Sequence, residues 1–206
     1  MVDRSEQLLD LGAATLGESG ARRMDPRVAA VWSGAVIFGP AYAVRCSPGD
    51  NLGVHVGVTT APSGSVLCVD VGGVRELGYW GEVLTTAAQA RGLIGLVIDG
   101  CVRDVDALRR RGFPVFSTGR ALTGATKHQP GEVGGWCSIG GVRVATGDWI
   151  VGDVDGVVCI DAPALDSVIE SGSERTNKER TMFERLMSGA TTVELLELDD
   201  SLIVRR

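Results

Sequence analysis

The stretch GEVLTTAAQARGLIGLVIDGCVRD, residues 81–104, decides the fold of this chain. Residues 82–90 are compatible with a helix, and residues 93–98 form a short apolar run that is followed by Asp99-Gly100. An apolar run of this length next to a turn signal is typical of a strand buried in a parallel sheet. The stretch therefore predicts a helix, a buried strand that ends at Asp99-Gly100, and a charged turn.

Charged residues stand at both ends of this unit. Arg103 and Asp104 follow the predicted strand, whereas Gly81 and Glu82 open the predicted helix. Ligands of open α/β folds bind beyond the carboxyl ends of the strands, and the free N–H groups of a helix start attract anions. The sequence therefore predicts one anion-binding pocket between the helix start and Arg103.

Strands and helices alternate on either side of this unit. Apolar runs at residues 35–46 and 65–71 precede it, and another follows at residues 112–119. A short helix carrying His55 is predicted after the turn at residues 47–51, and another over residues 102–111. This βαβαβ order predicts a layered α/β domain. Within the first run, Gly39-Pro40 predicts a strand that bends or ends there.

The two ends of the chain differ from this centre. Residues 5–16 predict an amphipathic helix, and the glycine-punctuated residues 131–160 predict several hairpins. Residues 162–188 predict a long polar helix whose thin apolar stripe consists of Leu165, Val168 and Ile169. Because so narrow a stripe offers little to a core, we expect this helix to pack on a neighbouring subunit.

Composition limits the classes of function. The chain has 206 residues, 44% of them hydrophobic and 22% charged, which predicts a single globular domain over residues 1–206. A net charge of −6 argues against nucleic acid and anionic membranes as partners. The sequence contains neither a signal peptide nor an apolar stretch of membrane-spanning length, so we expect a cytoplasmic protein.

The cysteines do not form a metal or disulfide pattern. They are five in number and widely separated, without CxxC or CxxH spacing. Most lie in apolar runs, where cysteine behaves as a small hydrophobic residue. Cys101 is next to the Arg-Asp turn, but no histidine stands near it in the sequence, so the same interpretation is favoured there.

Three segments carry a resemblance to a known family: residues 81–104, GFPVFSTG at residues 112–119, and GDWIVGDVDGVVCI at residues 147–160. They resemble the 4-hydroxy-4-methyl-2-oxoglutarate / 4-carboxy-4-hydroxy-2-oxoadipate aldolases, a family that also includes the regulator of ribonuclease activity A. The resemblance implies the layered α/β/β/α domain of that regulator, of the swivelling β/β/α kind, with a long C-terminal helix. It also implies a homotrimer, or a homohexamer of stacked rings.

The resemblance further implies roles for individual residues. Asp104 matches the aspartate that holds a divalent metal ion, Mg²⁺ or Mn²⁺. Arg103 matches the arginine that contacts the oxo-acid group of the substrate. Gly81, Glu82, Val83 and Leu84 match the helix start whose backbone amides bind the substrate carboxylate. Glu82 also matches the family's catalytic acid, which is often aspartate in other members.

Three more positions follow from the same resemblance. Lys127 matches a lysine near the site. Glu179 matches a catalytic glutamate that the closing helix of a neighbouring subunit contributes, with Glu174 as the alternative for this role. Gly17-Glu18 stands where the family commonly has a Ser-Asp pair, a departure that bears on the choice of substrate.

The chemistry fits these residue types independently of the resemblance. Retro-aldol cleavage of a 4-hydroxy-2-oxo acid generates the enolate of pyruvate, whose negative charge requires a Lewis acid and a nearby cation. Asp104 with its metal ion and Arg103 would meet this need, and Glu82, acting through a bound water, would move the proton. Loss of carbon dioxide from oxaloacetate gives the same enolate, so oxaloacetate decarboxylation is expected as a second activity.

Other interpretations stay open. On spacing alone, Arg103-Asp104 would be a helix cap with a surface ion pair, Glu82 a first-turn acid that complements the helix dipole, and Lys127 a solvated loop residue. The chain could also be a non-catalytic protein binder like the regulator of ribonuclease activity A, which departs from the Arg-Asp pair and lacks the long closing helix. A third function is another lyase or hydrolase on the same scaffold.

Overall fold

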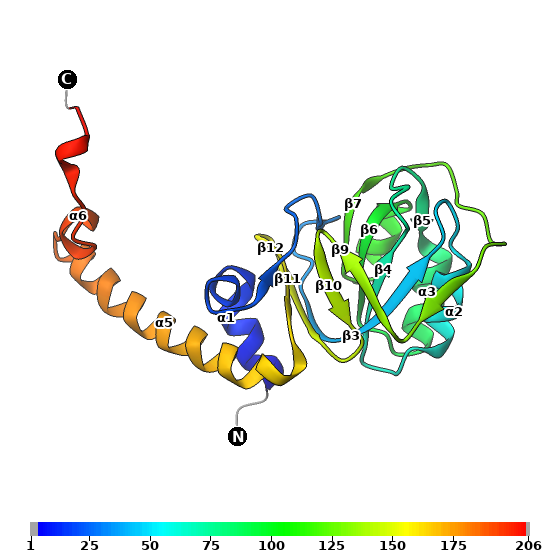
Figure 1. Cartoon of the computed structure of the whole chain (residues 1–206), viewed down its shortest axis with the longest axis horizontal. Coiled ribbons are helices and arrows are strands. Elements are labelled where there is room, and N and C mark those ends of the chain that lie inside the picture. Colours follow the sequence, from blue (N-terminus) through cyan, green and yellow to red (C-terminus); the bar gives the residue numbers. More distant parts are fainter. Residues whose placement is uncertain (1–3, 205–206) are drawn as a thin grey trace.

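The structure is a computed structural model that describes residues 4–204 (Figure 1). Its helices are α1 (Arg4–Glu18), α2 (Leu52–Thr60), α3 (Glu82–Ala90), α4 (Val105–Arg110), α5 (Leu165–Met187) and α6 (Thr192–Leu195), with 3₁₀ turns at Ala162–Ala164 and Asp200–Leu202. Its strands are β1 (Arg22–Arg23), β2 (Ala29–Ala30), β3 (Ile37–Cys46), β4 (Val66–Asp70), β5 (Gly78–Trp80), β6 (Gly95–Val102), β7 (Val115–Arg120), β8 (Gly131–Val133), β9 (Trp136–Ile139), β10 (Val142–Ala145), β11 (Trp149–Asp153) and β12 (Gly156–Ile160).

Strands β3, β4, β6 and β7 form the parallel centre predicted by the βαβαβ pattern. Antiparallel strands continue the sheet from β3 through β11 and β12 to β1. Strand β3 does not end at Gly39-Pro40, as one form of the prediction had it, but changes its partner there. Residues 37–40 pair with β11, and residues 41–45 pair with β4. Gly39 stands next to this change, and a Cβ atom at this position would lie 2.5 Å from Cδ1 of Ile94, so the close packing there requires a glycine.

Three apolar clusters separate four layers. The first lies between the parallel strands and helices α2, α3 and α4, and the second lies between those strands and the β9–β12 segment. The third lies between β11 and β12 on one side and α1 and α5 on the other. Successive residues alternate between clusters, as a strand with two buried faces requires: Leu67 belongs to the first and Cys68 to the second, and Ile150 to the second and Val151 to the third. The predicted α/β/β/α layering is confirmed.

Strand β6 is longer than the sequence predicted. It runs past Asp99-Gly100 to Val102, with a shift in its register against β7 between Ile98 and Cys101. The buried Asp99 carboxylate accepts two hydrogen bonds from Arg75, at 2.6 and 3.0 Å, so a charged residue is tolerated inside the strand. Helix α4 correspondingly begins only at Val105, three residues later than predicted.

The cysteines are free thiols, and no disulfide joins them, in agreement with the sequence analysis. Burial raises the pKa of Cys101 above its ordinary value, which favours the unreactive thiol form.

Helix α5 leaves the body of the protein after its second turn. Its buried residues are Leu165, Val168, Ile169 and Gly172, of which the first three were the predicted apolar stripe. The rest of the helix and α6 extend away from the layered body (Figure 1). None of the helices described in residues 4–204 combines the length and apolar character needed to cross a membrane.

Candidate active site

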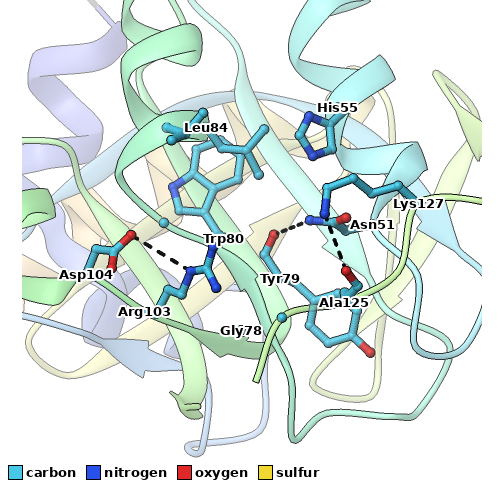
Figure 2. Close-up of a pocket in the computed structure, with 13 residues that line it drawn as sticks. Asn51, His55, Gly78, Tyr79, Trp80, Leu84, Arg103, Asp104, Ala125 and Lys127 are labelled. Carbon is cyan, nitrogen blue, oxygen red and sulfur yellow. Dashed lines mark hydrogen bonds and ion pairs between the residues drawn. The ribbon is translucent and has the colours of Figure 1, made fainter. Parts of the chain in front are cut away.

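A cavity of about 180 Å³ lies beside the start of α3, at the carboxyl ends of the parallel strands (Figure 2). Six of the residues singled out in the sequence line it: Gly81, Val83, Leu84, Arg103, Asp104 and Lys127. The remaining lining residues are Asn51, His55, Gly78, Tyr79, Trp80, Gly124 and Ala125. The two ends of the 81–104 stretch therefore meet at one pocket, as its βα pattern predicts.

Arg103 is positioned by the backbone around it. Its N–H donates to the carbonyl oxygen of Trp80 at 2.9 Å, directly after β6. Its side chain packs against Gly78, Gly81 and Gly124, where added Cβ atoms would lie 3.4, 3.1 and 3.4 Å from it. Because glycines form this wall, the guanidinium can lie close to the backbone of three separate segments. It remains partly exposed, with its Nε 3.9 Å from Oδ2 of Asp104.

Asp104 adopts a left-handed backbone conformation, with φ 59° and ψ 33°. This conformation is unfavourable for most residues but tolerated by aspartate and asparagine. Asp104 stands at the start of α4, yet its side chain does not cap that helix. Its Oδ2 instead accepts the N–H of Glu82 at 3.0 Å, at the first residue of α3. The carboxylate therefore caps the preceding helix, α3, beside which it lies, a different arrangement from the local cap considered in the sequence.

Asp104 is suited to a metal ion that takes few protein ligands. Among residues 4–204, no group of three or more His, Cys, Asp or Glu side chains could hold a metal by itself. Mg²⁺ is commonly held by one or two carboxylates and keeps several waters, and Mn²⁺ also prefers oxygen ligands. The half-exposed Asp104 carboxylate on the cavity wall fits such an ion.

The first turn of α3 lies at the wall of the cavity. Val83 and Leu84 line it, and N–H groups in the first turn have no acceptor within their own helix. Gly81 precedes them, and a Cβ atom there would lie 2.4 Å from Oδ2 of Asp104. A glycine at this position therefore allows the helix start and the carboxylate to share one wall.

The carboxylate of Glu82 is engaged outside the lining of the cavity. Its Oε1 lies 3.0 Å from Nη2 and 3.1 Å from Nε of Arg111, at the end of α4. For Glu82 to move a proton in the cavity, its ion pair with Arg111 would have to open, or a water would have to connect its carboxylate to the cavity. The role stays a prediction.

Glu179 is on α5, beyond the last buried residue of that helix, Gly172. The projecting part of α5 lies away from α3 of the same chain (Figure 1). It forms an ion pair at 2.9 Å with Arg175, which also pairs with Glu18. The Gly17-Glu18 departure therefore borders α5 rather than the cavity. Glu174 is likewise on α5 and exposed. A role for either glutamate in the cavity requires a second chain, as the sequence analysis had it.

Asp50 holds the loop that carries Lys127. It is 1% exposed, and its carboxylate accepts hydrogen bonds of 2.6–3.1 Å from the N–H groups of Leu52, His128 and Gln129 and the hydroxyl of Thr126. Burial opposes its ionisation, but these hydrogen bonds outweigh burial and lower the pKa of Asp50 well below its ordinary value. These hydrogen bonds anchor the loop, and the side chain of Lys127 on it is exposed.

Sequence reasoning missed Asn51 and His55 as cavity residues. Asn51 ends the turn at residues 47–51 and precedes the first residue of α2, and His55 lies one turn into that helix. The only available signal was the position of that turn at the carboxyl end of a parallel strand, β3, beside the strands that lead to Arg103. His55 and Lys127 are far apart in the sequence, so no motif indicates that they line the same cavity.

Comparisons with known proteins show the family to which the chain belongs. Residues 5–159 match the RraA-like family, described as Aldolase/RraA. The chain belongs to this family. It is 30% identical over 201 residues to an uncharacterized protein of Methanocaldococcus jannaschii, covering 97% of both chains. It is 31% identical over 156 residues to a Halalkalibacterium halodurans protein named "Putative 4-hydroxy-4-methyl-2-oxoglutarate aldolase", covering 74% of each.

The fold is also similar to solved structures of RraA proteins. The structure of a Streptomyces coelicolor member of the RNase ES inhibitor RraA protein family aligns with a TM-score of 0.77 and 25% identity, over 90% of this chain and 98% of that chain. The family resemblance predicted from residues 81–104 is thus confirmed. Because the relatives include both named aldolases and RNase inhibitors, family membership alone leaves both kinds of function open.

Proposed function

We propose that this RraA-like protein is a divalent-metal-dependent lyase that cleaves a 4-hydroxy-2-oxo acid to pyruvate by retro-aldol chemistry. The observation that carries the proposal is the meeting of the Arg103 guanidinium, the Asp104 carboxylate and the start of α3 at one cavity. The aldolase names of several relatives support the reaction class.

Different residues of the cavity would bind different parts of the substrate. The N–H groups at the start of α3, at Val83 and Leu84, would bind the carboxylate of carbon 1. Arg103 would donate to the oxygen on carbon 2, and its charge would stabilise that oxygen as it becomes an enolate. Asp104 would hold the Mg²⁺ or Mn²⁺ ion, which supplies a Lewis acid for the same oxygen.

Cleavage begins when the hydroxyl on carbon 4 gives its proton to a base. The bond between carbons 3 and 4 then breaks, and its electron pair becomes the carbon–carbon double bond of the pyruvate enolate. The fragment with carbon 4 leaves as an aldehyde or ketone, and protonation of carbon 3 completes pyruvate. Glu82 would exchange these protons through a water after separating from Arg111, and Lys127 would donate to oxygens at the cavity mouth.

Oxaloacetate decarboxylation would use the same groups. Its bond between carbons 3 and 4 breaks with loss of carbon dioxide, and the electron pair enters the same enolate. A small substrate without a hydroxyl on carbon 4 would therefore still be turned over. No step at the Arg103 end differs between the two reactions.

Assembly into a ring of three, or two stacked rings, would complete the site. The projecting half of α5 exposes Phe183 and Met187, which are 59% and 90% exposed in the single chain. In a cyclic assembly, the projecting half of α5 of each chain would pack against the next chain, so that its exposed apolar side chains would be buried in every subunit alike. In such a ring Glu179 would reach the cavity of the next subunit.

A non-catalytic regulator remains the second candidate, because solved RraA structures share the fold. The distinguishing experiment measures pyruvate release from 4-hydroxy-2-oxo acids and oxaloacetate, with and without Mg²⁺. Pyruvate release that depends on the metal is expected. Absence of turnover across the panel would favour the regulator.

A further inference from the structure

The end of the cavity away from Asp104 contains a buried amide with one unused atom. Asn51 is 5% exposed and lines the cavity, and Figure 2 shows its amide between Tyr79 and Lys127. Its Nδ2 donates to the carbonyl oxygen of Tyr79 at 2.8 Å. Its Oδ1 is buried and has no hydrogen-bond partner within the part of the chain that the structure describes.

The orientation of this amide follows from its partner. The carbonyl of Tyr79 can only accept, so the NH₂ group must face it and Oδ1 must point elsewhere. A buried acceptor without a donor is unfavourable, and such atoms in native proteins call for an explanation. A donor supplied by a ligand in the adjoining cavity provides one.

His55 adds a second polar group at this end. It is half-buried, and burial together with the charge of Lys127 lowers the pKa of its imidazole. This lowering favours the neutral ring, in which one nitrogen donates and the other accepts. Lys127 lies at the exposed mouth, where its Nζ is 3.4 Å from the carbonyl oxygen of Ala125.

We propose that Asn51 and His55 form the subsite for the substituent on substrate carbon 4, and that this substituent carries a hydroxyl group. The inference rests on the proposed function, in which Arg103 and α3 hold carbons 1 and 2 at the other end. A hydroxyl can donate to Oδ1 of Asn51 and accept from His55 at once. A carboxylate has no proton to give to Oδ1, and a methyl group would leave it unpaired. The substrate class is thus a 2-oxo acid with hydroxyls on carbons 4 and 5.

Three substrates that differ only at carbon 5 test this directly. They are 4-hydroxy-2-oxopentanoate, with a methyl group, 4,5-dihydroxy-2-oxopentanoate, with a hydroxymethyl group, and 4-hydroxy-2-oxoglutarate, with a carboxylate. Each yields pyruvate, together with acetaldehyde, glycolaldehyde or glyoxylate respectively. We expect the native protein to prefer the hydroxymethyl compound over the methyl compound by at least about tenfold in kcat/KM, because only the former satisfies the buried acceptor.

Variants assign this preference to the subsite. Asn51→Leu, which removes the acceptor but keeps the same branched arrangement of heavy atoms, should bring the hydroxymethyl-to-methyl ratio of kcat/KM close to one. If the leucine variant does not fold, Asn51→Ala and His55→Phe repeat the comparison. Both should lower the hydroxymethyl-to-methyl ratio of kcat/KM toward one. Val56→Ala is the matched control, because Val56 is on the same helix, 41% exposed and outside the cavity lining; it should keep the native ratio.

The outcomes separate the two proposals. Equal cleavage of the methyl and hydroxymethyl compounds, a preference for the carboxylate compound, or a native ratio in Asn51→Leu would overturn the hydroxyl subsite while leaving the lyase intact. Failure of the native protein to release pyruvate from any of the three, and from oxaloacetate, would instead overturn the proposed function on which the subsite depends.

Discussion

Oδ2 of Asp104 accepts the backbone N–H of Glu82 at 3.0 Å, across 22 positions of sequence. This contact joins the end of β6 to the start of α3. It brings the carboxylate proposed to hold the metal ion beside the N–H groups proposed to bind the substrate carboxylate. The left-handed backbone of Asp104 directs the side chain there instead of toward its own helix.

Gly81 should be essential for this geometry. In Gly81→Ala the new Cβ atom would meet Oδ2 of Asp104 at 2.4 Å, so the carboxylate must move. We expect kcat/KM for pyruvate release to fall by about 10- to 100-fold, as displaced catalytic groups cause, with the fold retained by circular dichroism. Gly135→Ala is the control, since nothing lies within 4 Å of an added Cβ there, and it should remain active. Equal activity of the two variants would show that the close approach at Gly81 is unimportant.

Arg103→Lys should remain strongly impaired although the charge is kept. Lysine cannot offer two parallel N–H donors to the edge of an oxo acid. Its ammonium group also cannot replace the contacts of the guanidinium with the glycines that line the wall. A loss of about 100-fold or more in kcat is expected, in line with the removal of an oxyanion donor. Near-native efficiency in steady-state assays would reduce Arg103 to a surface residue.

Local patterns in the sequence predicted a layered α/β domain and one end of the cavity, whereas the α/β/β/α order of the layers came from the family resemblance. The apolar run before Arg103 and the glycine before Glu82 place these residues at a strand end and a helix start. The length of β6 was misjudged because Asp99-Gly100 is a turn signal locally, whereas here Arg75 neutralises Asp99 within the strand. The periodicity of a sequence does not indicate an ion pair between residues that are far apart in the chain.

Local patterns did not predict the other end of the cavity, where only Lys127 was expected, and that from the family resemblance. Asn51, His55 and Lys127 come from separate segments, which Asp50 holds together through hydrogen bonds to residues 126–129. The engagement of Glu82 by Arg111 is likewise a tertiary contact. Residue type alone marked Glu82 as a first-turn acid but did not indicate where its carboxylate points.

Asp50 should make stability depend on acid pH. Its pKa is lowered in the folded protein, so its ionised form contributes stability that is fully present above the unfolded pKa of about 4 and is lost as pH falls toward the folded value. Asp50→Asn should therefore lower the free energy of unfolding at pH 7, and its stability should decline less between pH 4 and pH 2 than that of the native protein. Urea unfolding across this range measures both, and parallel pH profiles would contradict the role of Asp50.

Complementation should reveal whether the site is shared between chains. Asp104→Ala and Glu179→Ala should each be inactive, because one removes the metal-holding carboxylate and the other the glutamate donated by the neighbour. Mixed rings should recover part of the activity, since some cavities then combine an intact Asp104 with an intact Glu179. Proven subunit exchange without recovery would place Glu179 outside the site, and a fully active monomer in solution would exclude a shared site altogether.

The metal dependence of pyruvate release, compared between the native protein and Asp104→Asn, tests the central claim most directly. Asparagine tolerates the left-handed backbone and keeps an acceptor for the N–H of Glu82, so the fold and the start of α3 should persist. The account predicts that Mg²⁺ supports pyruvate release by the native protein, that a chelator stops it, and that Asp104→Asn loses at least about 100-fold at any Mg²⁺ concentration. Native-level, chelator-sensitive release by Asp104→Asn would contradict the account, because the metal would then be held elsewhere.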